Sequence, residues 1–528
     1  MDLVKTHNLL PEGVSTTDAR SIEFATEVIN CLPYDPNDEQ MELLAAFAHF
    51  MLYGHPQAVM LVNGYAGTGK TSMIGGIVKA LTCRGRKTVL LAPTGRAAKV
   101  FTEYSGHTAY TIHRKIYRQN SYLSDGFSLA ENKHTDTIFI VDEASMIANM
   151  GLGGMSFGSG CLLDDLVHFV YQGRNDRLLL IGDKAQLPPV GEEESPALHA
   201  AMLEGYGLKV YECDLNEVLR QSEESGILYN ATMIRQMITH DDITQLPKIH
   251  FAGYSDIKPM PGAELIEALA DSYHHVGLDD TIVVTRSNKR ANIFNQGIRN
   301  MVLDREEELS QGDILMIVKN NYYWMEEERK KIKEKEFEER RVKSEGTESG
   351  TATHKVQSSK FQVQSNDIPA FLANGDRAKV LKVRRRIDLY GFRFATLLLQ
   401  FPDYDNYELE ATVLLDTLTS EAPALTHEQQ EQLFHQIEED YQDIPLKADR
   451  MKAIRQDQFF NALQVKFAYA VTCHKAQGGQ WAHVYVDQGY MTDDMLNPDY
   501  IHWLYTAFTR ATEMLYLVNW PETQTALE

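Results

Sequence analysis

The segment LVNGYAGTGKTSM, residues 61–73, constrains the fold of this chain more than any other stretch of its sequence. An apolar run precedes it, a helix-like run follows it, and Gly64, Gly69, Lys70 and Thr71 match the spacing G-x-x-x-x-G-K-[ST]. In such a unit, the backbone N–H groups of the glycine-rich turn and of the helix N-terminus surround phosphate groups. The lysine reaches the outer phosphate oxygens, and the threonine hydroxyl is a ligand for Mg²⁺. We therefore expect a nucleotide site on an α/β sheet.

Short apolar runs alternate with helix-like stretches on both sides of this segment. Strands are predicted at 58–64, 87–93, 137–143, 177–183 and 209–215, and a second series at 281–287, 465–478, 483–489 and 513–519. Strands that alternate with helices form parallel sheets covered on both faces. The sequence thus predicts an α/β fold with two such domains, the second of them split by a long insertion.

The domain boundaries follow from these two series. We expect an N-terminal extension over 1–34, a first α/β domain over 35–275, and a second made of 276–309 and 461–528. The insertion, 310–460, has a different texture from the rest of the chain.

Two stretches of the insertion can be interpreted. Residues 325–360 are dense in opposite charges at helical spacing and then become rich in Ser, Thr and Gly, which is typical of a solvated helix and a linker, with a binding role as the alternative. Residues 374–401 alternate in period two and predict a small β-barrel or meander. The run Arg384, Arg385 and Arg386 either contacts phosphate or is a solvated strand end. The segment 426–457 after it reads as one or two surface helices.

Composition limits the partners and the compartment. The 528 residues carry a formal net charge of -23, which by itself argues against nucleic acid as a partner. A nucleic-acid motor needs a basic track only along its groove, however, so this class is not excluded. The five cysteines are scattered and indicate neither a disulfide framework nor a zinc site. No signal-like segment and no run of 18 apolar residues occurs, so we expect a cytoplasmic protein without membrane contact.

Two further strand ends carry side chains suited to nucleotide chemistry. In TIFIVDEAS, Asp142 is a candidate ligand for Mg²⁺, and Glu143 is a candidate general base for the attacking water. In LLLIGDKAQLPPV, a buried strand ends at Gly182 and Asp183, and Gln186 is placed to sense the outermost phosphate of ATP. Alone, the first segment could be only a helix cap and the second only a turn with prolines. The phosphate loop is what favours the functional interpretation.

The motifs GYAGTGKTS, APTGRAAKV, VDEASM, GDKAQLPPV, LNEVLRQ, VTCHKAQGGQW and YTAFTRA occur in this order. The series resembles superfamily 1 DNA helicases, most closely the RecD-like branch that includes Dda and the Pif-type enzymes, over most of residues 35–520. The resemblance implies two RecA-like domains, with ATP and Mg²⁺ in the cleft between them and an SH3-like barrel inserted in the second. It also implies translocation on single-stranded DNA from 5' to 3', with roles in repair, recombination or replication.

The resemblance also assigns roles around the nucleotide. Gln40 resembles the upstream glutamine that reads the adenine edge, and Arg220 and Arg510 resemble two arginine fingers that reach the γ-phosphate. Gly478 and Gln480 resemble residues near the triphosphate on the second domain. The phosphate loop as a whole is expected to contact ATP through Gly64, Ala66, Gly67, Thr68, Gly69, Lys70, Thr71 and Ser72.

The expected DNA side is less specific in its chemistry. Six side chains resemble the family's strand-contacting positions, and each could equally be structural: Thr94, Arg96, His113, Thr472, His474 and Lys475. Residues 117–134 read as a turn-containing excursion, and Phe127 resembles a wedge that splits base pairs, with packing on the sheet as the alternative. We expect a monomer that binds single-stranded DNA and single-strand/duplex junctions, together with repair or replication proteins. A DNA-loading subunit, or the motor subunit of a nuclease complex, is the alternative function.

Overall fold

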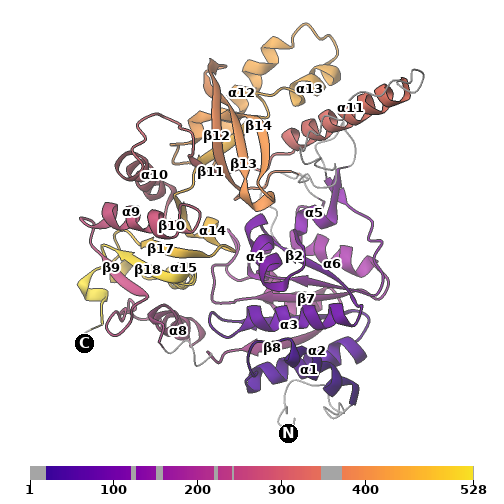
Figure 1. The fold of residues 1–528 in the computed structure, drawn as a ribbon, viewed down its shortest axis with the longest axis vertical. Helices are drawn as coiled ribbons and strands as arrows, with labels where there is room; N and C mark the ends of the chain where they lie inside the picture. Colours follow the sequence, from indigo (N-terminus) through magenta and orange to yellow (C-terminus); the bar gives the residue numbers. More distant parts are fainter. Residues whose placement is uncertain are drawn as a thin grey trace, which may run out of the picture. The chain divides into compact units, whose positions relative to one another are not determined.

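The computed structural model describes residues 19–119, 127–149, 158–218, 224–240, 243–345 and 371–526. The chain forms two compact units, one made of Met1–Glu306 with Tyr469–Glu528 and the other of Glu307–Ala468. The first unit contains two parallel sheets, and the second contains a β-barrel. This is the predicted fold class, which the structure confirms (Figure 1).

The first sheet has six parallel strands in the order β3-β2-β6-β7-β1-β8. The phosphate loop leaves the end of a central strand, so that the ends of several strands surround it. The strands are β1 (Ala58–Gly64), β2 (Lys87–Ala92), β3 (Ala109–Thr111), β6 (Thr137–Val141), β7 (Arg177–Gly182) and β8 (Lys209–Leu215). All but the short β3 lie where the apolar runs predicted a strand.

Both faces of this sheet are buried, which explains why its strands are continuous apolar runs. Met60 and Val62 of β1 face one core, and Val59 and Leu61 face the other. The first core is closed by α1 (Ala19–Asn30), α2 (Asp38–Tyr53), α3 (Lys70–Cys83) and Phe101 of α4 (Gly95–Ser105). The second is closed by α5 (Ile112–Ile116), α6 (Leu162–Gln172) and α7 (Ala200–Gly205).

The predicted excursion at 117–134 contains a small hairpin. Strands β4 (Tyr117–Gln119) and β5 (Phe127–Leu129) pair antiparallel, with Gln119 opposite Phe127. Phe127 therefore begins a strand. Residues 120–126 and the Phe127 side chain lie outside the described part of the structure.

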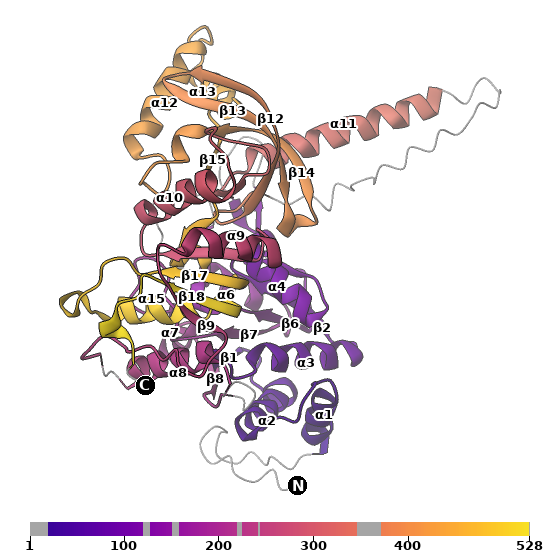
Figure 2. The same ribbon diagram turned by 60° about the vertical axis from the view of Figure 1, so that its left-hand side comes forward.

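The second sheet has five parallel strands in the order β16-β10-β17-β18-β9. They are β9 (Ile257–Met260), β10 (Thr281–Thr285), β16 (Ala470–Thr472), β17 (Trp481–Asp487) and β18 (Ala511–Val518). Helix α8 (Gly226–Thr239) leads into this sheet, which also packs against α9 (Leu265–His275), α10 (Asn288–Gly297), α14 (Cys473–Ala476) and α15 (Pro498–Phe508). Figure 2 shows α9 beside β17, where Ser272 of α9 hydrogen-bonds with Tyr485 at 2.7 Å.

Pairing with β18 extends the second sheet back to Ile257, before the boundary predicted at residue 275. The sequence IKPM gave no apolar run, because Lys258 and Pro259 are exposed on this edge strand. Proline is tolerated at a sheet edge, where its missing N–H breaks no ladder bond.

The second unit is a closed barrel of β11 (Ile314–Ile317), β12 (Arg377–Leu389), β13 (Phe392–Phe401), β14 (Tyr407–Leu414) and β15 (Leu463–Phe467). Neighbouring strands are antiparallel except β14 and β15, which are parallel and joined through α12 (His427–Asp440) and α13 (Lys447–Arg455). The charged stretch forms α11 (Tyr323–Glu345). The barrel prediction is thus confirmed.

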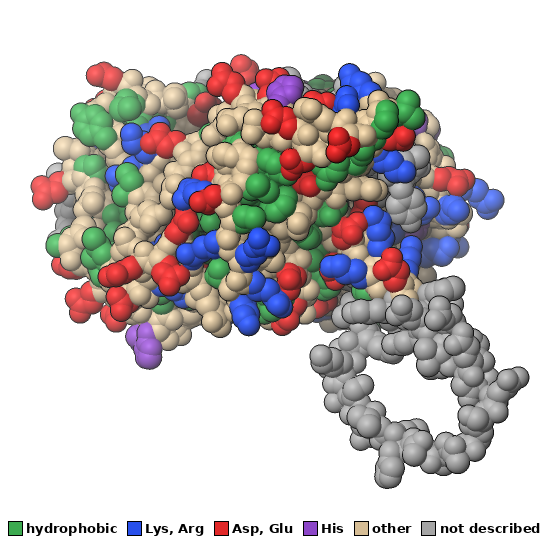
Figure 3. Space-filling view, turned by 90° about the horizontal axis from the view of Figure 1, so that it is seen from above, with side chains coloured by type: hydrophobic (Ala, Val, Ile, Leu, Met, Phe, Trp, Pro, Cys, Tyr) green, Lys and Arg blue, Asp and Glu red, His purple; other side chains and the backbone are tan. Residues whose placement is uncertain are grey.

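Arginines of the basic run on β12 have carboxylate partners within this unit. Arg384 pairs with Glu410 at 2.9 Å, and Arg386 pairs with Glu307 at 3.2 Å. The face in Figure 3 likewise carries basic and acidic side chains next to one another. Phosphate binding by these two arginines would first have to break ion pairs. Within the described ranges, no helix is both long and apolar enough to span a bilayer.

Candidate active site

The phosphate loop has the backbone that its glycines allow. Gly67 and Gly69 have φ angles of +79° and +77°, a region that side chains with a Cβ rarely adopt. Gly69 is the N-cap of α3, so the free N–H groups of the first helical turn open toward the loop. Lys70 Nζ donates to the Gly64 carbonyl at 2.9 Å, which holds the ammonium group above the turn.

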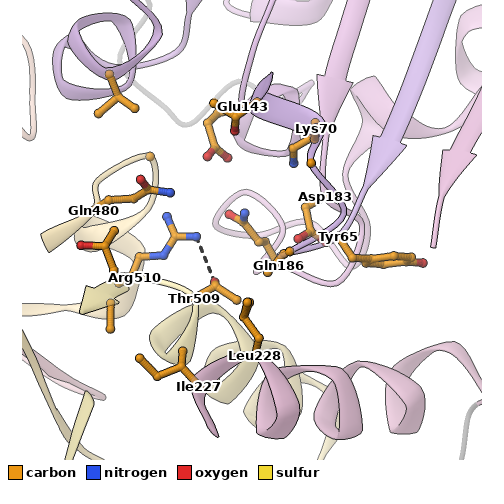
Figure 4. Close-up of a pocket in the computed structure, with 18 of the residues that line it drawn as sticks. Tyr65, Lys70, Glu143, Asp183, Gln186, Ile227, Leu228, Gln480, Thr509 and Arg510 are labelled. Carbon is orange, nitrogen blue, oxygen red and sulfur yellow. Dashed lines mark hydrogen bonds between the residues drawn. The ribbon is translucent and has the colours of Figure 1, made fainter. Parts of the chain in front are cut away.

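A pocket of about 580 Å³ opens at this loop and is lined from both sheets of the first unit. Figure 4 shows Lys70 and Glu143 on one side of it and Gln480 and Arg510 on the other. Most of the residues predicted to handle the nucleotide line this pocket: Ala66, Gly67, Gly69, Lys70, Thr71, Asp142, Glu143, Gln186, Gly478, Gln480 and Arg510. The predicted residues Gly64, Thr68, Ser72 and Gln40 are not part of this lining.

The two carboxylates after β6 differ in their surroundings. Asp142 Oδ2 accepts a hydrogen bond from the Tyr104 hydroxyl at 2.5 Å, and Oδ1 accepts one from the Glu143 N–H at 2.8 Å. Burial raises the pKa of Asp142 and the adjacent Glu143 raises it further, while Lys70 lowers it. Glu143 has a φ of +52°, and its Oε2 atom is buried without a hydrogen-bond partner in the described structure. Its carboxylate is therefore open to a ligand.

The segment after β7 brings a second polar pair to the pocket. Asp183 is 1% exposed, and its Oδ1 accepts from the Ala185 N–H at 2.9 Å. Gln186 is also buried, and its Oε1 has no hydrogen-bond partner among the described residues. The Oε1 atom of Gln186 is therefore available for a hydrogen bond with a group that enters the pocket.

Arg510 reaches the pocket from the end of α15. Its guanidinium donates to Thr506 O at 2.9 Å, Gly479 O at 3.1 Å and Thr509 Oγ1 at 3.0 Å. All three acceptors belong to the second domain, so the side chain is preorganised at the edge of the pocket. Gly478 has a φ of +69°, and a Cβ there would lie 3.0 Å from Ala97 Cβ. Glycine thus allows this loop to approach α4.

Gln40, the predicted reader of the adenine edge, hydrogen-bonds within the chain at both ends of its amide. The side chain is fully buried, Nε2 donates to Thr68 O at 2.9 Å, and Oε1 accepts from the Asn37 N–H at 3.2 Å. Both ends of the amide are engaged within the chain, and the residue supports the phosphate loop from behind. Reading an adenine edge would require these bonds to break.

Two predicted DNA contacts near α4, Thr94 and Arg96, make hydrogen bonds within the first unit. Thr94 caps the helix, with its Oγ1 accepting from the Ala97 N–H at 3.2 Å. Arg96 donates to Gln480 O at 2.7 Å, and its guanidinium lies 4.4 Å from the centre of the Trp481 ring. In this arrangement Arg96 joins the two sheets instead of facing open solvent.

Other predicted site residues are His113, three residues at the end of β16, and the predicted arginine finger Arg220. His113 is partly buried, and burial lowers its pKa to about 4, so its ring is neutral. Thr472, exposed His474 and half-buried Lys475 lie together at the end of β16, and burial lowers the pKa of Lys475 to about 8. Arg220 lies outside the described residues, so its predicted role as an arginine finger stays a prediction.

Two tyrosines at the pocket were missed by motif reasoning. Tyr104 of α4 donates to Asp142, and Tyr505 of α15 donates to Asp183 Oδ2 at 2.7 Å. Tyr505 stands in the quoted motif YTAFTRA, so its sequence position was visible although its partner was not. Nothing in the spacing around Tyr104 indicated that it would reach a carboxylate on another strand.

The donor set fits Mg²⁺ bound together with a nucleotide. Thr71 and Asp142 line the same pocket, and Mg²⁺ is commonly held by one or two protein oxygens plus phosphate oxygens and waters. In the described ranges, no group of three or more His, Cys, Asp or Glu side chains could hold a metal ion. An ion held by Thr71 and Asp142 would take its remaining ligands from phosphate oxygens and water.

Fold and pocket together define a P-loop nucleotide-binding protein with two RecA-like domains. Residues 36–245 match the family described as "AAA domain", and residues 467–518 match "UvrD-like helicase C-terminal domain". Together with the ordered motifs, these matches confirm the resemblance to superfamily 1 helicases of the RecD and Dda type.

Individual relatives match only part of the chain. The ATP-dependent RecD2 DNA helicase of Deinococcus radiodurans is 32% identical over 158 residues, which are 29% of this chain and 18% of that protein. The ATP-dependent DNA helicase dda of Enterobacteria phage T4 is 26% identical over 268 residues, 48% of this chain and 55% of that protein. The chain therefore spans about half, or less, of the curated relatives it matches.

Among solved structures, a Pif1 helicase from Bacteroides in complex with ADP-AlF3 and single-stranded DNA is similar with a TM-score of 0.41 and 14% identity. The similarity covers 94% of this chain and 95% of that one.

Proposed function

We propose that the chain is an ATP-dependent DNA helicase that moves along single-stranded DNA from 5' to 3'. The observation that carries this proposal is the pocket lined by Lys70, Thr71, Asp142 and Glu143 of the first domain and by Arg510 of the second. Such a pocket is sensitive both to a nucleotide and to the spacing of the two domains. The resemblance to superfamily 1 DNA helicases supports DNA as the track, and the direction rests on the motif resemblance.

The hydrolytic step is assigned to residues of the first domain. Loop N–H groups and Lys70 bind the phosphates, and Thr71 and Asp142 hold the Mg²⁺ that neutralises charge on the transferred group. Glu143 accepts the proton of the attacking water, a role suited to its buried and unpartnered Oε2. Gln186, after the neighbouring strand β7, orients or senses the reacting group.

Arg510 couples this chemistry to domain position. An arginine directed at the phosphoryl group stabilises negative charge that develops in the transition state. Since Arg510 is held by acceptors of the second domain alone, its distance from the phosphate changes whenever the two sheets move. Hydrolysis and movement along DNA are linked in this way.

The DNA track is assigned to the strand end of the second sheet that carries Thr472, His474 and Lys475. Hydroxyl, imidazole and ammonium groups hold phosphates without reading base sequence. A local set of this kind is compatible with the acidic net charge, because only the groove has to be attractive to DNA.

The test uses two partial duplexes, one with a 5' and one with a 3' single-stranded tail, with strand-stimulated ATP hydrolysis measured in parallel. We expect the wild-type chain to open only the 5'-tailed duplex and Lys70→Ala to lose both hydrolysis and unwinding. Lys79→Ala is the matched control, because Lys79 is an exposed lysine on the same helix α3.

The outcomes separate the parts of the proposal. Opening of only the 3'-tailed duplex would leave the helicase and reverse the direction. Stimulated hydrolysis with neither duplex opened would overturn the helicase in favour of an ATP-gated loading subunit. Absence of hydrolysis in the wild-type chain would overturn the proposal as a whole.

A further inference from the structure

One hydroxyl group of the second domain reaches the phosphate loop of the first. Tyr505 lies on α15 and is 1% exposed. Its hydroxyl donates to Asp183 Oδ2 at 2.7 Å and accepts from the Ala66 N–H at 2.9 Å. Because Ala66 belongs to the phosphate loop and Asp183 follows β7, a single side chain fastens two segments of the first domain.

The same helix also holds the backbone that follows Asp183. Thr506 Oγ1 accepts from the Leu187 N–H at 2.8 Å, and Gln477 Nε2 donates to the Leu187 carbonyl at 2.6 Å. His502 Nδ1 lies 2.9 Å from the Ala185 carbonyl oxygen. Residues 183–187, which include Gln186, are therefore docked on the second domain through both backbone and side-chain groups.

The tyrosine in this contact stays protonated. Burial holds the pKa of Tyr505 well above its usual range, and burial also raises the pKa of Asp183. The Tyr505 hydroxyl keeps its proton and can donate it to the carboxylate, while its oxygen accepts from Ala66. One hydroxyl thus pairs with a half-buried donor and with the buried Asp183 carboxyl group, which would be costly to leave unpaired.

We propose that Tyr505 is a positioning residue for ATP hydrolysis, which fastens the phosphate loop and the Asp183–Gln186 segment to α15 so that both follow the second domain. The inference rests on the proposed ATPase and adds a second link between the domains beside Arg510. Arg510 carries charge toward the phosphate, whereas Tyr505 sets where the groups of the first domain stand. Misplacement of reacting groups by about 1 Å can cost about a hundredfold in rate.

The variant that tests this is Tyr505→Phe, which removes the hydroxyl and keeps the buried ring. Tyr500→Phe is the matched control, because Tyr500 lies on the same helix, is 2% exposed, and donates at 2.5 Å to Gln488 Oε1 of its own domain. We expect Tyr505→Phe to lower kcat of strand-stimulated hydrolysis by at least about tenfold, with KM for ATP within about threefold of wild type. Tyr500→Phe should stay close to the wild-type kcat.

A second measurement does not depend on activity. Amide hydrogen exchange of the nucleotide-free full chain should be faster in Tyr505→Phe for peptides that contain Ala66 and residues 183–187, and unchanged there in Tyr500→Phe. A kcat of Tyr505→Phe equal to wild type, or an equal fall in both variants, would overturn the positioning role.

Hydrogen exchange separates failure of the proposed ATPase function from failure of the Tyr505 contact. If the wild-type chain hydrolyses no ATP, the proposed function fails and the positioning role fails with it, while faster exchange in Tyr505→Phe would still establish the domain contact. Unchanged exchange in an active wild-type background would overturn the contact alone.

Discussion

Glu143 has two energetically unfavourable features, one in its backbone and one in its side chain, that a residue without a chemical role would avoid. Its φ of +52° is uncommon for a side chain with a Cβ, and its Oε2 is buried without a partner in the described structure. An unsatisfied buried acceptor costs about 1–3 kcal/mol. Strained and unsatisfied groups of this kind concentrate at functional sites, where a ligand completes their bonding.

We therefore predict that Glu143→Gln separates nucleotide binding from hydrolysis. The amide keeps the size of the side chain but cannot accept a proton from water, so kcat should fall about 10²- to 10⁴-fold. Binding of ATP, measured by equilibrium titration, should change little. Glu103→Gln on the exposed side of α4 is the control. Equal loss of binding and turnover in Glu143→Gln would instead indicate damage to the phosphate site.

Lys475 leads to a pH prediction for the proposed DNA contact. Burial lowers its pKa to about 8, so the ammonium group loses its charge as the pH rises through that value. A DNA phosphate favours the charged form, so binding takes up a proton above about pH 8. Affinity for single-stranded DNA should therefore weaken between pH 7 and 9, by up to about tenfold. Fluorescence anisotropy at constant salt measures it.

Lys475→Gln serves as the reference for that experiment. It should bind more weakly at pH 7 and lose most of the dependence between pH 7 and 9. The pKa of His474 is already lowered by burial, so this ring stays neutral over the same range. A variant that keeps the full wild-type slope would exclude Lys475 as the titrating contact.

Motif spacing located side chains whose partners lie nearby in sequence, such as Lys70 and Thr71 in the loop or Asp142 and Glu143 at one strand end. It did not locate Tyr104 or the contacts of Gln40, because their partners come from other elements. A hydrogen bond between distant residues depends on how helices pack on the sheet, and a single sequence carries no direct signal of that.

At the scale of elements, two glycines with a positive φ angle have different surroundings, one in the phosphate loop and one at the end of α4. Gly67 has a φ of +79°, and a Cβ there would lie 3.2 Å from both Leu228 and Val218 side chains. Gly106, the C-cap of α4, has a φ of +71° but open space around it. Comparing substitutions at Gly67 and Gly106 therefore separates the effect of backbone strain from the effect of crowding at the nucleotide pocket.

We predict that Gly67→Ala and Gly106→Ala lose similar stability from the left-handed backbone, about 1–2 kcal/mol each. Only Gly67→Ala should also weaken ATP binding, because its methyl group displaces the loop or the start of α8. Chemical denaturation measures the first effect and nucleotide titration the second. Tighter or unchanged ATP binding in Gly67→Ala would contradict a pocket shaped by this glycine.

Some strands could be predicted from the sequence and others could not. Strands β1 and β7 are buried on both faces and were evident as apolar runs, whereas β9 has two exposed residues and was not. The hairpin of β4 and β5 has three residues in each strand, too few for a periodic pattern. Burial on both faces is what makes a strand readable.

At the scale of the molecule, the first unit is two sheets that share one pocket. The contacts of Tyr505 and Arg96 across it are hydrogen bonds and ring stacking, which can be exchanged when the domains move. Few side chains therefore link the spacing of the two sheets to the chemistry in the pocket. Arg510 brings a positive charge from the second domain to the lining of this pocket.

We predict that Arg510→Lys lowers kcat of strand-stimulated hydrolysis by about 10³-fold or more, the range known for arginine fingers. Lysine keeps the charge but cannot reproduce a planar group that donates at once to Thr506, Gly479 and Thr509. The ammonium is therefore no longer aimed at the pocket. Affinity for ATP should change much less than kcat, because the loop and Lys70 still bind the phosphates.

Arg290→Lys distinguishes this from a general loss of stability. Arg290 donates to Asp487 at 2.6 and 2.8 Å in the same domain but lies away from the pocket lining, so its replacement should lower the melting temperature without lowering kcat. If Arg510→Lys keeps its rate and loses only stability, as Arg290→Lys should, Arg510 is a structural arginine. Domain movement would then have to reach the phosphate through the Tyr505 contact, and Tyr505→Phe would become the slower of the two variants.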